Sequence, residues 1–240
     1  MRAIALLVGA FLLTTATPAP AQLDSILKEV DTWTRPGSAT PGGVKIGAAL
    51  KQALQVGSEN AVKLTGRTDG YFANKAIKIL MPDRLRTVDR GLRTAGYGSK
   101  VDELVLSMNR AAERAAPAGK KIFWDAIGEM TIDDAQRILN GTPTAATDYF
   151  KSKTSVSLRI AFRPVVEKAM NEVGTVRQYN DLLGQAKAIP FLKTEDYELD
   201  RYVVGKALDG LFYVVGEEER KIRSDPSARV TDLLKEVFGK

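Results

Sequence analysis

Residues 199–223 read LDRYVVGKALDGLFYVVGEEERKIR, a stretch long enough for one helix that crosses a whole domain. From Tyr202 to Val215, apolar residues lie on nearly every face, which is typical of a central helix surrounded by other helices. Gly205, Gly210 and Gly216 lie inside this stretch, and each costs about 1 kcal/mol relative to alanine. We therefore expect close backbone packing at these glycines.

The end of the same stretch is expected to face water. Glu217 and Lys221 are spaced as an i,i+4 pair with the acid first, and so are Glu219 and Arg223. This order is the favourable one on a helix surface, where each pair contributes about 0.2–0.5 kcal/mol. The two pairs therefore indicate the solvated end of the helix.

Helical periodicity continues over most of the remaining chain. Apolar residues recur at spacings of three and four, and glycine or proline follows most of these runs. The pattern predicts helices in the ranges 23–33, 45–64, 85–92, 101–115, 122–127, 132–139, 144–173, 176–183 and 226–238.

Several residues predict where these helices begin, bend or end. Thr131 with Asp134 resembles an N-terminal cap, and Gly141 is expected to end that helix in a left-handed conformation. Pro164 is expected to kink the range 144–173 or to divide it in two. Gly174 closes the same range.

Residues 65–82 do not follow helical periodicity. Asp69-Gly70 is a turn signal, and Ile77, Ile79 and Met81 then alternate over a stretch too short to found a sheet. We predict an ordered, extended loop. The expected fold is all-α, a single-domain multi-helix bundle with a short extended loop near residues 65–82.

The N-terminus resembles a secretory signal peptide. Arg2 precedes the apolar run 4–13, and Ala19-Pro20-Ala21 offers the small residues of a cleavage site. The run is shorter than the about 20 apolar residues that a permanent membrane span requires. We predict a signal peptide at 1–21 with cleavage near Ala21, an N-terminal segment and Pro/Gly linker at 22–42, and a helical domain at 43–240. The mature protein is expected to be periplasmic or secreted, with no permanent transmembrane segment.

Composition excludes several kinds of chemistry. The chain has no cysteine and no histidine, which rules out thiolate nucleophiles, disulfides, serine-histidine triads and imidazole zinc sites. We expect no metal and no cofactor. The formal charge of +6 is compatible with anionic partners, namely envelope lipid, wall polymer or an envelope protein, more than with nucleic acid. A basic composition that only aids solubility is the alternative.

Three segments resemble signatures of a known family. They are DEL at 102–104 with SMNRAAE at 107–113, MTIDDA at 130–135, and KALDGLF at 206–212 continuing through EEE at 217–219 to RVTDLL at 229–234. In these segments the chain is similar to the bacterial exported family catalogued as domain of unknown function 4197. The resemblance extends from residue 43 onward and implies one domain. The family has no assigned activity, so no catalytic residues follow from it.

A first candidate ligand site lies on the polar face of the range 101–115. Glu103, Asn109, Arg110 and Glu113 share this face, and Glu113 stands at i+3 from Arg110 and i+4 from Asn109. An arginine fork beside a carboxylate and an amide can hold a small anionic or sugar-like ligand. The alternative is an ion pair at the surface or between helices, with the amide bonded to a neighbouring helix end.

A second candidate is Asp209, which lies among apolar residues of the helix expected to be the most buried. A buried carboxylate without a partner costs several kcal/mol, so we expect a cation such as Lys206 nearby or a raised pKa. A structural ion pair is one reading of Asp209. A proton-transfer group or a metal ligand is the other.

A third candidate is the arginine stripe of Arg86, Arg90 and Arg93. The range 75–121 holds eleven Lys or Arg and five Asp or Glu, and Asp83 and Asp89 are placed to compensate only part of the stripe. The stripe is expected to contact an anionic surface, where each basic residue contributes about 1 kcal/mol. A solvated helix face is the alternative.

Two functions agree with the sequence. The preferred one is an exported, non-catalytic helical protein that binds an envelope component. The alternative is a carboxylate-dependent hydrolase or lyase of cell-wall glycan, with a general acid drawn from Glu59, Glu113 or Asp209. Such chemistry needs two carboxylates about 5–9.5 Å apart beside a cleft, which a chain without histidine can supply.

Overall fold

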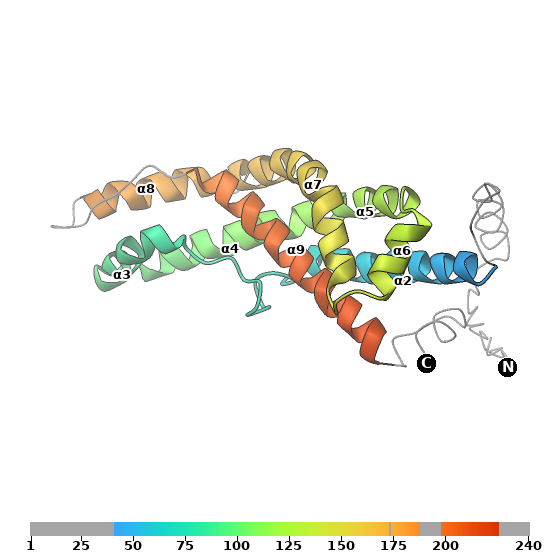
Figure 1. The fold of residues 1–240 in the computed structure, drawn as a ribbon. Helices are drawn as coiled ribbons and strands as arrows, with labels where there is room; N and C mark the ends of the chain where they lie inside the picture. Colours follow the sequence, from blue (N-terminus) through green and yellow to red (C-terminus); the bar gives the residue numbers. More distant parts are fainter. Residues whose placement is uncertain (1–40, 173, 188–197, 226–240) are drawn as a thin grey trace, which may run out of the picture. The chain divides into compact units, whose positions relative to one another are not determined.

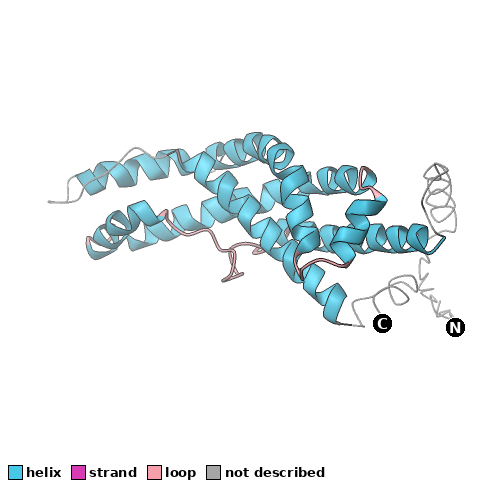
Figure 2. Cartoon of the chain, viewed as in Figure 1, coloured by secondary structure: helices cyan, strands magenta, loops and turns pink. Residues whose placement is uncertain are grey.

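The computed structural model describes residues 41–172, 174–187 and 198–225, and in these ranges it contains helices and loops but no strand (Figure 2). The signal peptide and the helices predicted at 23–33 and 226–238 lie outside the described residues. The α-helices are α2 (Pro41–Gly66), α3 (Arg86–Thr94), α4 (Gly98–Ala115), α5 (Gly119–Gly128), α6 (Ile132–Leu139), α7 (Ala145–Glu172), α8 (Thr175–Lys187) and α9 (Leu199–Ser224). The 3-10 turns are η1 (Asp83–Leu85) and η2 (Ala116–Ala118).

The chain divides into two compact units, residues 1–44 and 45–240. In the first unit only residues 41–44 are described, as the beginning of α2. Helix α2 begins at Pro41, whereas the sequence predicted the helical domain from residue 43. The fixed φ angle of proline suits the first position of a helix. The second unit contains the other described helices and their shared core.

The centre of the second unit is formed by α4, α7 and α9, which pack against one another. Figure 1 shows α9 crossing both α4 and α7. Leu104, Phe162 and Leu211, one from each helix, are fully buried. Helices α3 and α8 pack on α4, and α5 and α6 pack on α7. The all-α fold predicted from the sequence is confirmed.

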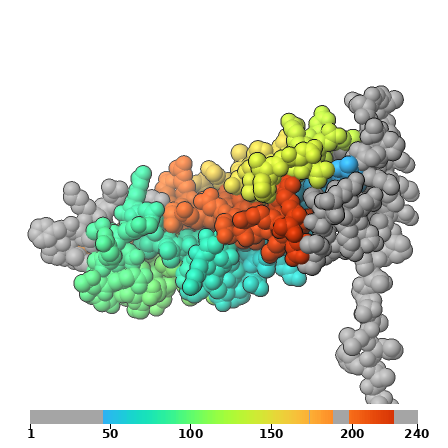
Figure 3. Space-filling view, turned by 60° about the horizontal axis from the view of Figure 1, so that its bottom comes forward, coloured from blue at the N-terminus to red at the C-terminus, as the bar shows by residue number. Residues whose placement is uncertain are grey.

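Helix α9 is buried along most of its length but reaches the surface along one side. Lys206, Asp209, Tyr213 and Arg220 are exposed there, and Figure 3 shows the orange-to-red segment at the surface of the unit. The prediction of a central helix surrounded by others is confirmed for the rest of α9 and is wrong on this side. These residues recur at helical spacing, so they form a single polar stripe within an otherwise apolar helix.

The glycines of α9 differ in what lies beside them. A Cβ atom placed at Gly210 would lie 2.5 Å from Cε1 of Tyr71, so this position admits only glycine without a shift. A Cβ atom placed at Gly216 would be in ordinary contact with Oγ1 of Thr147, at 3.5 Å. Nothing lies within 4 Å of a Cβ at Gly205. Close packing is therefore confirmed at Gly210 and wrong at Gly205.

Loop 67–82 joins α2 to η1 and carries the alternation predicted for it (Figure 2). Ile77, Ile79 and Met81 are buried, whereas Leu80 between them is 57% exposed. Asp69 adopts a positive φ of 64° in the turn. The loop thus places one side of its backbone against the helices and the other side toward solvent.

The predicted helix boundaries have mixed outcomes. Thr131 caps α6 through a capping box with Asp134, as predicted. Gly174 follows α7, as predicted, and has a φ of +68°. Helix α7 continues as one helix through Pro164, so the predicted division there is wrong. Gly141 has no positive φ, so the expected left-handed stop is wrong. Glycine is required there for a different reason, since a Cβ would lie 2.6 Å from the carbonyl oxygen of Arg137.

Candidate functional site

Glu113 of α4 is a buried carboxylate that holds the backbone of loop 67–82. Its Oε1 accepts hydrogen bonds from the backbone N–H groups of Tyr71 and Phe72, at 3.1 Å each. Arg110, one turn earlier on α4, donates to Oε2 at 2.6 Å and to Asp69 of the loop at 2.7 Å. These bonds raise the pKa of Arg110, chiefly through the bond to Glu113. One carboxylate and one guanidinium thus fix the turn at the start of the loop.

Asn109 holds the end of the same loop. The side chain is fully buried, its Oδ1 accepts from the backbone N–H of Ile79 at 2.9 Å, and its Nδ2 donates to the Ile79 carbonyl at 2.7 Å. Nδ2 also donates to the carbonyl of Val105, at 2.7 Å. The amide therefore bonds Ile79 as a neighbouring strand would, and it uses both of its donor hydrogens within the protein.

Tyr71 connects the loop to α9. Its hydroxyl donates to the carbonyl of Ala207 at 2.6 Å, and its ring packs on Gly210. Burial, together with the nearby Glu113 carboxylate, raises the pKa of Tyr71 well above its ordinary value. The hydroxyl therefore stays a neutral donor, and the loop ties α4 to α9.

The first predicted site is thus assembled only in part. Asn109, Arg110 and Glu113 come together around loop 67–82, whereas the side chain of Glu103 is exposed and takes no part in these bonds. The observed bonds are close to the alternative interpretation of this site, an ion pair with an amide bonded to a neighbouring helix end. The difference is that Asn109 bonds the backbone of the loop and not a helix end. The polar groups that a ligand would use already bind the protein itself.

Asp209 is not buried, contrary to expectation. Its side chain is 75% exposed and lies 3.8 Å from Lys206, the cation that the sequence indicated. The prediction was wrong because Asp209 belongs to the exposed polar stripe of α9, although its immediate neighbours in the sequence are apolar or glycine. Among the described residues, no group of three or more Asp or Glu side chains is placed to hold a metal ion.

Glu219 of α9 is a second buried carboxylate, and the sequence had indicated that it faces water. Its Oε1 accepts from the backbone N–H of Ala146 at 3.0 Å, and Oε2 accepts from the N–H and the hydroxyl of Thr147 at 2.9 and 2.8 Å. Glu219 thereby caps the first turn of α7. Its spacing of four from Val215 and three from Ile222, both buried, is the sequence signal that could have revealed this burial.

The ion pairs around Glu219 differ from those expected. The predicted pair with Arg223 forms at 2.9 Å, and Arg223 also donates to the carbonyl of Ile138 at 2.8 Å. Glu217 pairs with Arg220 instead of Lys221. Because these bonds reach α6 and α7, this end of α9 is an interface between helices rather than a solvated terminus.

The arginine stripe on α3 is largely compensated by carboxylates. Arg86 pairs with Asp83 at 2.6 Å, and Arg93 pairs with a carboxylate of its own helix at 2.7 Å and with Asp102 at 2.8 Å. The bond from Asp102 is the main cause that raises the pKa of Arg93. Arg90 is exposed and makes no ion pair among the described residues. The stripe stays a prediction as a binding surface.

A second basic surface lies on α7 and was not identified from the sequence. It consists of Lys153, Val156, Arg159, Ile160 and Arg163, all of them exposed. We call these five residues the α7 basic face. The two apolar members are the most exposed large hydrophobic residues in the described part of the chain, at 73% and 70%.

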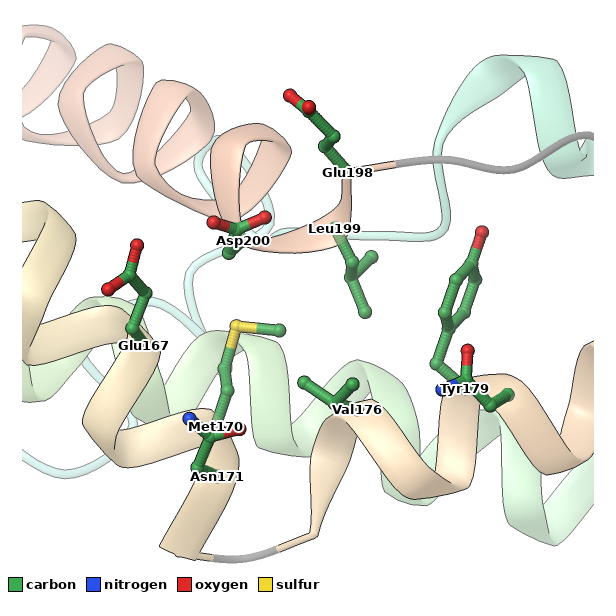
Figure 4. Close-up of a pocket in the computed structure, with 9 residues that line it drawn as sticks. Glu167, Met170, Asn171, Val176, Tyr179, Glu198, Leu199 and Asp200 are labelled. Atoms are coloured by element: carbon green, nitrogen blue, oxygen red, sulfur yellow. The ribbon is translucent and has the colours of Figure 1, made fainter.

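A pocket of about 280 Å³ lies where α7, α8 and α9 approach one another (Figure 4). It is lined by Glu167, Met170, Asn171, Val176, Tyr179, Asn180, Glu198, Leu199 and Asp200. Its volume is at the small end for a ligand site. None of the three proposed general acids lines it. Glu59 pairs with Lys120 at 2.6 Å, Glu113 holds the loop, and Asp209 is exposed.

Among the described helices, none combines the length and the apolar content that crossing a bilayer requires. The chain has no significant match among curated proteins or solved structures. The model of one protein family, described as a protein of unknown function (DUF4197), matches residues 41–239. This range contains every described helix together with the loop that Asn109 and Glu113 hold. The chain therefore belongs to the DUF4197 family.

Proposed function

We propose that this protein is exported and acts without catalysis, by binding an anionic component of the cell envelope. The observation that carries the proposal is a difference between the charged groups. The buried carboxylates of Glu113 and Glu219 bond backbone amides of the fold, whereas basic side chains with no acidic partner among the described residues lie on the surface. A protein arranged in this way is suited to attract negative charge rather than to transfer protons.

The positions of Glu59, Glu113 and Asp209 argue against a glycan hydrolase that draws its general acid from these three residues. Such an enzyme requires two carboxylates on either side of one bond of the substrate. Glu113 has its oxygens bonded to loop 67–82 and Arg110, and Glu59 is paired with Lys120 at the surface. Asp209 lies on the exposed stripe of α9. The three candidates therefore occupy three different environments.

The basic side chains favour an anionic partner. On α7, Lys153 and Arg159 make no ion pair among the described residues, and Arg90 of α3 is likewise exposed without one. Surface charges of one sign raise the local concentration of oppositely charged partners, and the effect weakens as salt rises. The proposal therefore predicts binding that depends on ionic strength.

The proposal is tested with the mature chain, residues 22–240, and two anionic targets. One is a suspension of vesicles made of equal parts phosphatidylglycerol and phosphatidylethanolamine, and the other is purified wall fragments. We expect sedimentation with at least one target at low salt and its loss near 1 M salt, where the screening length falls to about 3 Å. If the protein binds neither the vesicles nor the wall fragments at low salt, the proposed function is wrong.

Export is tested separately. Expression of the full chain with its own N-terminus should yield a protein in the periplasm or medium whose first residue is Gln22, as determined by mass spectrometry. Replacing Ala19 and Ala21 by bulky residues should leave the uncleaved chain in the membrane fraction. An uncleaved full-length chain in the cytoplasm of the unaltered strain would show that the N-terminus is not a signal peptide.

A further inference from the structure

Helix α7 exposes two large apolar side chains one helical turn apart. Val156 and Ile160 are 73% and 70% exposed, and their spacing of four places them on the same side of the helix. The opposite side of this part of α7 belongs to the core, where Leu158 and Phe162 are fully buried. The helix is therefore held in place by its inner face while its outer face presents apolar surface to the surroundings.

Basic side chains surround this apolar pair. Lys153 precedes Val156 by three residues and Arg163 follows Ile160 by three, so the four lie along one stripe, with Arg159 beside it. No acidic residue occurs in the sequence between Asp148 and Glu167. Arg163 pairs with Glu167 at 3.4 Å, at the end of the stripe.

The arrangement is that of an interfacial helix face. Long basic side chains can extend to anionic headgroups while short apolar side chains enter the boundary of the acyl region. An anionic lipid surface satisfies the charges and removes the apolar pair from water at the same time. The arginine stripe of α3 lacks this combination, because Val88 and Leu92, the large apolar residues of α3, are buried. Two of its three arginines are also already paired with carboxylates.

We infer that the α7 basic face docks on the surface of an anionic lipid bilayer, with Val156 and Ile160 inserted at the interface. This inference rests on the proposed function and names both its site and its ligand class. Only the outer face of α7 takes part, so docking requires no unfolding of the bundle. The orientation places the side of α7 that faces α4 and α9 away from the lipid.

The first experiment compares two variants that remove the same positive charge. One carries Lys153→Gln, Arg159→Gln and Arg163→Gln, and the matched control carries Arg86→Gln, Arg90→Gln and Arg93→Gln. All six residues are exposed, so both variants should fold. Circular dichroism checks that they do. At low salt we expect the α7 variant to bind phosphatidylglycerol-containing vesicles about 100-fold more weakly than the parent, and the control to lose at most about tenfold.

The second experiment tests the apolar pair. Val156→Ser with Ile160→Ser should weaken vesicle binding about tenfold at unchanged charge. The matched control, Leu80→Ser with Tyr213→Ser, alters two exposed apolar side chains on the loop and on α9 and should bind like the parent. Equal losses in the two double variants would contradict insertion by the α7 face.

The third experiment reports the environment of the face directly. The chain has no cysteine, so Ile160→Cys creates a single site for a polarity-sensitive fluorophore, and Asp209→Cys supplies the control on α9. With anionic vesicles the label at position 160 should shift its emission to the blue, and the label at 209 should not. An unchanged emission at 160 while the protein is bound to the vesicles would overturn the inference.

The outcomes also separate this inference from the proposed function. If the parent binds wall fragments but not vesicles, the lipid inference is wrong and the proposed function stands. The same holds if the α3 variant loses vesicle binding while the α7 variant keeps it. If the parent binds neither target, both are wrong.

Discussion

Two buried glutamates hold backbone amides in this protein, and they do so in different ways. At Glu113 one oxygen accepts both loop amides, and the other oxygen faces only Arg110. At Glu219 each oxygen accepts one amide of α7, and Arg223 binds beside them. Both sites combine a buried carboxylate with an arginine of the same helix. They differ in how the hydrogen bonds from backbone amides are distributed over the two carboxylate oxygens.

This distribution determines which replacement each site can tolerate. A glutamine has one acceptor oxygen and one donor NH₂ group. At position 113 the remaining oxygen can still accept both loop amides. At position 219 either orientation of the amide places the NH₂ group against a backbone N–H, so a donor faces a donor. The two sites should therefore respond very differently to the same conservative change.

The largest effect is expected from Glu219→Gln. It breaks a buried ion pair with Arg223 and leaves at least one buried N–H of α7 without an acceptor, so the free energy of unfolding should fall by about 3–5 kcal/mol. Urea denaturation of residues 22–240 measures the change. The matched control is Glu217→Gln, two residues earlier on α9, whose pair with Arg220 is partly exposed and worth at most about 1 kcal/mol. Similar losses in the two variants would show that Glu219 does not cap α7.

The second largest effect is expected where loop 67–82 packs against α9. In Gly210→Ala the new Cβ would lie 2.5 Å from the ring of Tyr71, so the loop must shift away from α9. Overpacking of this kind costs about 1–3 kcal/mol, and we expect about 2 kcal/mol by urea denaturation. Gly205→Ala is the control on the same helix, because nothing lies within 4 Å of its Cβ. That variant should instead be more stable by about 0.5–1 kcal/mol, from helix propensity alone.

The outcome at these glycines bears on how the loop is held. If Gly210→Ala proves as stable as Gly205→Ala, the contact of Tyr71 with α9 contributes little, and α4 alone positions the loop. A loss in Gly210→Ala that disappears when Tyr71 is also replaced by leucine would assign the effect to this one contact.

A smaller effect is expected from Glu113→Gln. Both loop amides keep their acceptor, and Arg110 keeps Asp69, so only the bond between Arg110 and position 113 is lost. Because the Arg110 side chain is one-third exposed and can turn to water, we expect a loss of about 1 kcal/mol. Glu113→Ala removes the acceptor as well and should cost clearly more. Equal losses in the Gln and Ala variants would mean that the charge of Glu113, and not its geometry, holds the loop.

The parts of this structure that sequence reasoning predicted are those that depend on nearby residues. Val101, Leu104 and Met108 recur at helical spacing, and all three are fully buried in α4. The alternation of Ile77, Ile79 and Met81 likewise predicted an extended loop, and all three side chains are buried on one side of it. In each case the periodicity of the local backbone decides which side chains share a face.

The parts that could not be predicted depend on residues far apart in the chain. Glu219 accepts an amide 73 residues earlier, and Glu113 accepts one 42 residues earlier. No local spacing specifies such a partner, so an acidic residue on a helix is interpreted as solvated unless its apolar neighbours are considered. Asp209 shows the opposite error, because apolar neighbours surround it in the sequence while its own stripe faces water.

A last comparison sets the distant cap of α7 against the local cap of α6. Thr131 and Asp134 cap α6 reciprocally over three residues, with the hydroxyl of Thr131 donating to the Asp134 carboxylate at 2.8 Å and accepting from its N–H at 3.1 Å. Thr131→Ala should cost about 0.5–1 kcal/mol, less than Glu219→Gln, because this cap is exposed and water can replace it.

The pH dependence of this loss distinguishes the cap from a general weakening of α6. The hydrogen bond from Thr131 holds the pKa of Asp134 below its ordinary value of 3.8. A carboxyl group with a lowered pKa stabilises the folded state above its unfolded pKa, and this contribution is lost as the pH falls through the folded value. The difference in stability between parent and Thr131→Ala should therefore be full at neutral pH and shrink below about pH 4. A difference that stays constant from pH 7 to pH 3 would indicate that helix propensity, and not the bond to Asp134, carries the effect, since only the bond depends on the ionised carboxylate.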